Sequence, residues 1–148
     1  MTRYDYPGAP ARREDGRGAA AFALLRAWAA GIVALVVTEY AQATLVYDHL
    51  AGDGELESFG GRMLLVHLPN ALCVALAAWA AGRVHSDPFR WSSPQHLAAV
   101  LAVPVVAQLL SMVVQWDRLA LEGLLLSNAV LVVGCVAGYA ADRLQDGD

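Results

Sequence analysis

Four apolar runs of about 20 residues or more occupy most of this chain of 148 residues. They cover residues 22–46, 63–84, 97–116 and 119–141. An α-helix of about 20 residues crosses a hydrocarbon core of ~30 Å. Only 16% of the residues are charged, against roughly 25% in an average globular chain, so a water-soluble bundle would lack the polar residues that cover its surface. The sequence therefore predicts an all-α integral membrane four-helix bundle.

A single domain accounts for the whole chain. Residues 1–18 are rich in Gly, Pro, Arg and Ala and have no apolar period, so we expect a disordered cytoplasmic tail. Residues 19–148 then form one four-span transmembrane domain. The first run is longer than the ~7–15 residues of a secretory signal core, and we expect it to remain as an uncleaved span.

The distribution of arginine predicts the orientation of the spans. Eight of the ten arginines lie before or at the start of the first span, between the second and third spans, or after the fourth: Arg3, Arg12, Arg13, Arg17, Arg26, Arg83, Arg90 and Arg143. The connection between the first two spans is acidic instead. Because cytoplasmic loops carry an excess of Lys and Arg, we expect a multi-pass protein of the cytoplasmic (plasma) membrane with both termini inside.

Two halves of the chain resemble each other weakly. At a shift of 69 residues, the segment beginning Tyr47-Asp48 matches the segment beginning Trp116-Asp117, with a Leu-Ala pair following in each. At a shift of 58, Asn70 matches Asn128. The pattern indicates two parallel-repeat helical hairpins, related by an axis along the membrane normal. Chance matching of apolar runs is the alternative explanation.

Polar residues inside the four runs share one depth. Glu39 and Gln108 each lie eight residues inward of an aromatic residue at the predicted outer boundary, or ~12 Å along a helix. We expect a polar layer in the outer half of the bilayer, formed by Glu39, Gln42, His67, Asn70, Gln108, Ser111 and Asn128. Asp48 and Asp117 would flank its outer mouth. Pro69 would bend the second span beside this layer and free a backbone carbonyl.

The polar layer permits three functions. Glu39 is the only acidic residue deep inside a span, and a charge at mid-bilayer costs ~2.5–3.5 kcal/mol on insertion scales. The first interpretation is a protein that binds or translocates a small solute, cation or proton at Glu39, as a homo-oligomer. The second is a non-catalytic accessory or scaffold subunit, in which the same residues hold helices together or bind an unidentified membrane-protein partner. The third is an intramembrane lipid- or quinone-modifying enzyme with Glu39 and His67 as acid and base.

Other residue patterns argue against catalysis and cofactors. The sequence contains no nucleophile, nucleotide or metalloprotease motif, and its two cysteines have no paired spacing. The four histidines are scattered over both predicted sides, so we expect no enzyme activity, metal or cofactor. The net charge of −4 disfavours nucleic acid, which leaves the lipid bilayer as the expected partner. Gly134-x-x-x-Gly138 is a helix-packing motif that suits packing within the chain or a dimer equally well.

Overall fold

Four long helices form the computed structural model, which describes residues 12–46, 57–85, 93–118 and 120–145. They are α1 (Arg12–Leu45), α3 (Leu68–Val84), α4 (Ser93–Val114) and α5 (Leu121–Leu144). A short α2 (Phe59–Arg62) and a π-helical turn η3 (Met63–His67) lead directly into α3, and a 3-10 turn η5 (Trp116–Arg118) lies between α4 and α5. No strand occurs in the described ranges, and the predicted all-α class is confirmed.

The helices end close to the predicted boundaries, but α1 and α4 begin earlier, as does the segment of residues 59–67 that leads into α3. Their last residues agree with the predicted run ends to within three positions. α1 begins at Arg12, well before residue 22, and therefore runs through residues 12–18 of the predicted tail. Three of these seven residues are Arg, which has high helix propensity, and three alanines follow at 19–21, so a helix can continue beyond its apolar part. Residues 1–11 and Asp48 lie outside the described residues.

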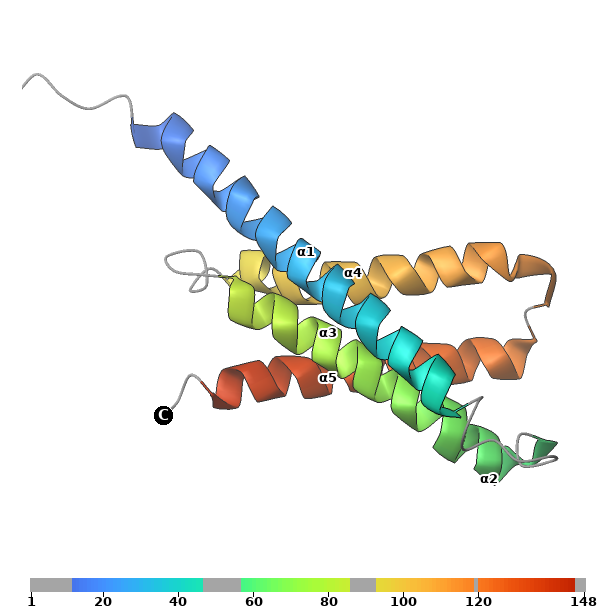
Figure 1. The fold of residues 1–148 in the computed structure, drawn as a ribbon. Coiled ribbons are helices and arrows are strands. Elements are labelled where there is room, and N and C mark those ends of the chain that lie inside the picture. Colours follow the sequence, from blue (N-terminus) through green and yellow to red (C-terminus); the bar gives the residue numbers. More distant parts are fainter. Residues whose placement is uncertain (1–11, 47–56, 86–92, 119, 146–148) are drawn as a thin grey trace, which may run out of the picture.

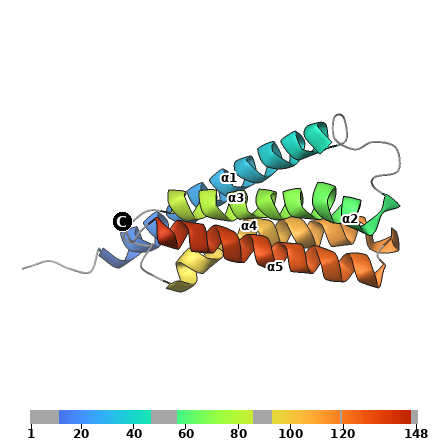
Figure 2. The ribbon, with the colours of Figure 1, turned by 90° about the horizontal axis from the view of Figure 1, so that it is seen from below.

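The helices form two crossed layers. α1 and α3 run side by side in one layer, and α4 and α5 make the other (Figures 1 and 2). α3 contacts all three of the other long helices, and α4 also contacts both α1 and α5. The contact between α1 and α3 is extensive, whereas that between α4 and α5 is small. The two predicted hairpins therefore pack differently, and their duplication stays a sequence-based prediction.

Small side chains allow α3 to pack closely against its neighbours. Its buried face consists of Cys73, Val74, Ala77, Ala78, Ala81 and Gly82. α5 meets this face with its two motif glycines. A Cβ added at Gly134 would lie 2.6 Å from Val74 Cγ1, and one added at Gly138 would collide with the Ala75 carbonyl. The Gly-x-x-x-Gly motif thus packs α5 against α3 within one chain.

The outer surface of the bundle is apolar. Large apolar side chains such as Val36, Val113 and Leu125 are exposed on three different helices. Gly18–Leu45, Phe59–Val84, Pro94–Val114 and Leu121–Leu144 are each long and apolar enough to cross a membrane. An apolar exterior combined with a small buried core is expected when lipid replaces water as the surrounding solvent.

The helix leading to Pro69 is irregular, as its sequence predicts. Proline has no N–H to donate to the carbonyl four residues earlier. The chain responds with the π-helical turn η3, in which the Leu68 N–H bonds to the Met63 carbonyl. The Val66 carbonyl in this turn accepts a hydrogen bond from Gln42 Nε2 of α1 at 3.3 Å. The irregular turn therefore accepts a hydrogen bond that links α1 to the segment that precedes α3.

We expect Gly138→Ala to lower the free energy of unfolding by about 1–3 kcal/mol, as overpacking of a close helix contact does. Gly123→Ala, on the same helix, is the matched control, since a Cβ there meets nothing within 4 Å. That control should be neutral or stabilising by up to about 1 kcal/mol, because Ala favours a helix over Gly. Unfolding in detergent followed by circular dichroism measures both. Equal stability of the two variants would contradict the assigned α3–α5 contact.

Candidate functional site

A small polar cavity lies where all four long helices meet. Its volume is about 90 Å³, which is room for about three waters at ~30 Å³ each. The polar residues that line it are Glu39 of α1, Asn70 of α3, Gln108 and Ser111 of α4, and Ser127 of α5. Apolar residues, among them Leu35 and Val74, complete the wall. A polar, partly open space thus lies among the helices of a bundle whose exterior is apolar.

Helical spacing explains why these side chains converge. Residues three or four apart share one face of a helix, as do Pro104, Gln108 and Ser111 of α4 in this cavity wall. Leu35 and Glu39 of α1 have the same relation. Pro104 also has no N–H for the carbonyl four residues before it. The α4 wall of the cavity therefore contains an interruption of the helical hydrogen bonds.

Four of the seven residues predicted for the polar layer line this cavity: Glu39, Asn70, Gln108 and Ser111. Among the described residues, the Glu39 carboxylate and the Asn70 and Gln108 amides form no hydrogen bond to another side chain. Glu39 is exposed, whereas the two amides are half-buried. These groups can therefore bind a water or an ion in the cavity.

The other three predicted residues lie elsewhere. Gln42 faces α3, and its Oε1 accepts a hydrogen bond from the Cys73 thiol at 3.2 Å. His67 lines hollows between the start of the second span and α5, away from the polar cavity. Asn128 donates to the Leu124 carbonyl of its own helix at 2.7 Å. Asp117, predicted at the outer mouth, is exposed in η5 beyond the end of α4.

Ser127 occupies the place in the cavity that the sequence assigns to Asn128. Its hydroxyl donates to the Gly123 carbonyl at 2.6 Å and still borders the cavity. Successive residues on a helix point about 100° apart, so a one-residue difference in register changes which side chain faces inward. The pairing of Asn70 with Asn128 in the repeat alignment concealed this difference.

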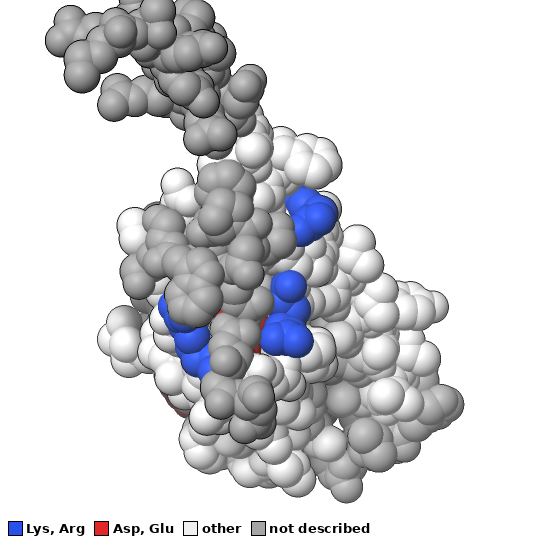
Figure 3. Space-filling model, turned by 90° about the vertical axis from the view of Figure 1, so that its left-hand side faces the viewer, with Lys and Arg blue, Asp and Glu red and all other residues white. Residues whose placement is uncertain are grey.

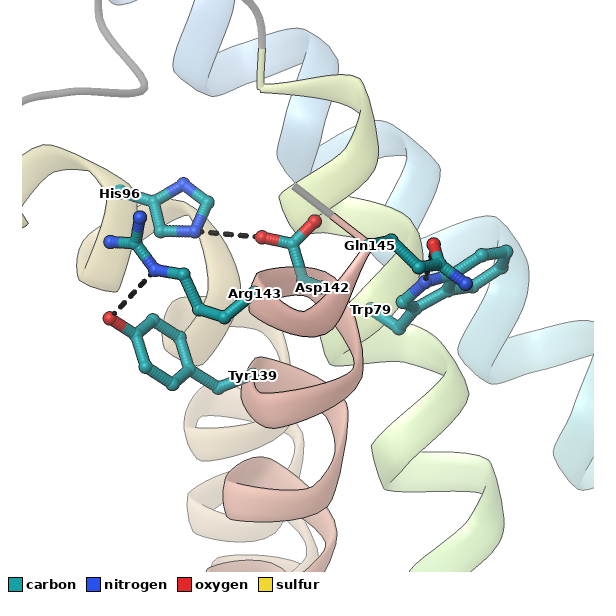
Figure 4. Close-up of polar contacts among 6 residues, drawn as sticks. All are labelled: Trp79, His96, Tyr139, Asp142, Arg143 and Gln145. Atoms are coloured by element: carbon teal, nitrogen blue, oxygen red, sulfur yellow. Dashed lines mark hydrogen bonds and ion pairs between the residues drawn. The ribbon is translucent and has the colours of Figure 1, made fainter. Parts of the chain in front are cut away.

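A second polar cluster, which we term the histidine–aspartate cluster, lies at the opposite end of the bundle. His85, His96 and Asp142 are completely buried there. His96 Nε2 lies 3.0 Å from Asp142 Oδ2 (Figure 4), and the two histidine rings are 5.7 Å apart. The Asp142 carboxylate sits against Gly82, where a Cβ would lie 2.8 Å from its Cγ. Within the described ranges, no group of three or more His, Cys, Asp or Glu side chains is arranged to hold a metal ion.

Side-chain hydrogen bonds, three between helices and one within α5, surround this cluster. The Trp79 indole N–H donates to Gln145 Oε1 at 3.1 Å (Figure 4), and the Trp28 indole N–H donates to the Ala98 carbonyl at 3.1 Å. Arg26 Nη2 donates to the Val84 carbonyl at 2.9 Å. Arg143 Nε donates to the Tyr139 hydroxyl at 3.0 Å (Figure 4). The cluster therefore lies where side-chain hydrogen bonds join α1 to α3, α1 to α4 and α3 to α5.

The histidine–aspartate cluster was not predicted from the sequence: the histidines were expected to be scattered, and Asp142 had no predicted role. The indication was available, because His85 follows the second run, His96 precedes the third and Asp142 follows the fourth, so all three share one predicted side of the membrane. Comparisons with protein-family models, curated proteins and solved structures found no match to this chain. Both clusters are therefore interpreted from their geometry.

We expect Asp142→Ala or His96→Ala to lower the free energy of unfolding by about 3 kcal/mol or more, because each leaves a buried polar partner behind. The double variant should lose less than the sum of the two. Glu122→Ala on the exposed start of α5 is the control, with an expected change of at most about 1 kcal/mol. Unfolding curves in detergent of the wild type, both single variants and the double variant give the four free energies of this double-mutant cycle. Strict additivity would mean that the two side chains do not interact.

Proposed function

We propose that this chain is an integral membrane protein that binds a small cation or proton at the polar cavity. Four helices of sufficient length and apolarity support the insertion into a membrane. The apolar exterior supports it as well, because such a surface is costly in water and favourable in lipid. The polar cavity then lies inside the hydrocarbon region, where polar side chains concentrate at functional sites.

We further propose that both termini face the cytoplasm and that the membrane is the plasma membrane. The end of the bundle that contains the histidine–aspartate cluster also carries Arg26, Arg83 and Arg143. Figure 3 looks onto this end and shows separate basic groups with little acidic colour between them. Trp28 and Trp79 lie at the same end, as residues at a membrane–water interface do. The proposed orientation follows from the positive-inside rule.

The orientation predicts a labelling pattern for two single cysteines. In a background with Cys73→Ala and Cys135→Ala, Gln115→Cys should react with a membrane-impermeant maleimide in intact cells. Gln145→Cys should react only after the membrane is opened. Both positions are exposed in the structure, so each is accessible from its own side. Labelling of Gln145→Cys in intact cells would contradict the proposed orientation.

The size and the lining of the polar cavity favour a small ion over a larger solute. A volume of about 90 Å³ is far below the ~300–1,000 Å³ of sites for drug-sized molecules. One carboxylate, two amides and two hydroxyls supply oxygen atoms, which are the ligands that hard cations prefer. The same groups can also hold a protonated carboxyl and its waters. The convergence of these oxygens from four helices is the observation that carries the proposal.

An accessory subunit is the second candidate. The exposure of Glu39 favours it, because a carboxyl at the surface of α1 could form a hydrogen bond with a partner helix. In this role Glu39→Gln should be tolerated, since an amide still forms such a bond. A cation or proton site should lose its function with the same substitution. The intramembrane enzyme has no support from the geometry, since His67 does not line the cavity that contains Glu39.

Infrared difference spectra of the purified protein in lipid test the ion site. We expect a carboxyl band that changes with acidification and with added Na⁺, and that is absent from Glu39→Gln. Glu122→Gln is the matched control, because it removes an exposed carboxyl at the first turn of α5 and should keep the band. An identical spectrum for wild type and Glu39→Gln, or a Glu39 band that responds to neither protons nor Na⁺, would reject the proposal.

A further inference from the structure

An apolar groove of about 500 Å³ lies between α1 and α4 and is open to the exterior of the bundle. Its walls include Trp28, Ile32 and Val36 of α1, and Val106 and Leu110 of α4. The two helices cross (Figure 1) and approach closely at Gly31, where an added Cβ would lie 3.3 Å from Val103 Cγ2, so the groove lies beside this crossing. Small residues of α4, such as Ala102, widen it further. Its volume is in the range that accommodates drug-sized molecules.

Glu39 is the one charged residue among those that line the apolar groove. It stands eleven residues after Trp28, or ~16 Å along α1, so the aromatic ring and the carboxylate lie toward opposite ends. The same carboxylate also lines the polar cavity, as Leu35 and Ala107 do. Glu39 therefore lies at the boundary between the apolar groove and the polar cavity among the four helices.

We propose that the apolar groove binds a hydrophobic organic cation, with its apolar body along α1 and α4 and its charged group at the Glu39 carboxylate. A neutral acyl chain would fill the groove but would leave the carboxylate without a compensating charge. An anion would be repelled by it. A hydrophobic cation satisfies both parts of the site, and the Trp28 ring adds an apolar, electron-rich surface.

The assignment rests on the proposed function, since it uses the carboxylate that holds the small ion there. One carboxylate cannot neutralise two cations, so the two ligands exclude each other. Binding of an organic cation to protonated Glu39 releases that proton to water, and binding to the Na⁺ form releases the Na⁺. The groove and the cavity are thus coupled through a single side chain, with no change in the fold required.

Tetraphenylphosphonium is the test ligand and tetraphenylborate its anionic control, because the two ions have nearly the same size and shape. Purified protein in neutral lipid should bind the phosphonium saturably, with release of protons, and should not bind the borate saturably. Glu39→Gln should weaken phosphonium binding by about tenfold or more, which corresponds to ~1.4 kcal/mol, because the opposite charge is lost. Equilibrium dialysis measures the binding.

Val106→Trp separates this inference from the proposed function. The bulky ring fills the apolar groove without altering Glu39, so phosphonium binding should fall while the carboxyl band still responds to protons. Leu125→Trp, at an exposed position of α5, is the control and should bind as wild type does. Equal uptake of phosphonium by wild type and Glu39→Gln, or equal saturable binding of the borate, would show that the Glu39 carboxylate does not select the ligand and would overturn this inference. A responsive Glu39 band with no phosphonium binding would overturn this inference and leave the ion site standing.

Discussion

The close approach of α3 to its neighbours is the contact on which the rest of the fold depends. Ala77, Ala78 and Ala81 are completely buried on this helix, and the glycines of α5 meet it where no side chain fits. In a lipid environment helices gain little from the hydrophobic effect, so close packing of small residues supplies much of their attraction. The same packing leaves most large side chains on the outside, where they face the surrounding solvent.

Departures from regular helix packing create both candidate sites. The crossing of α1 over α4 opens the apolar groove, and the meeting of four helices around Pro104 leaves the polar cavity. The π-helical turn before Pro69 offers a backbone carbonyl to Gln42, which holds α1 near α3 at the level of the cavity. A bundle of straight and evenly packed helices would have none of these features.

The depth of a residue along a helix could be predicted from sequence, but its direction around the helix often could not. The position along a helix axis changes by only 1.5 Å per residue, so an error of one residue is small. Accordingly, the same cavity is lined by Glu39, Asn70, Gln108 and Ser111. Direction changes by about 100° per residue, so Ser127 replaces Asn128 there. The histidine–aspartate cluster depends on how three helix ends meet in space, which neither depth nor periodicity describes.

Side-chain hydrogen bonds between the two layers lie near one end of the bundle, and this placement affects how far α1 can be displaced at the other end. Trp28 and Trp79 each donate a side-chain hydrogen bond from the α1–α3 layer to the α4–α5 layer, and both bonds lie at the end with the histidine–aspartate cluster. α3 also packs closely on α5 at Gly134 and Gly138, so a rotation about a pivot at the Trp28 bond concerns α1 rather than a whole layer. From Trp28 to Leu45, α1 extends ~26 Å. A rotation of about 5° around the pivot would displace its far end by about 2 Å, which is comparable to the radius of a small ion's oxygen shell.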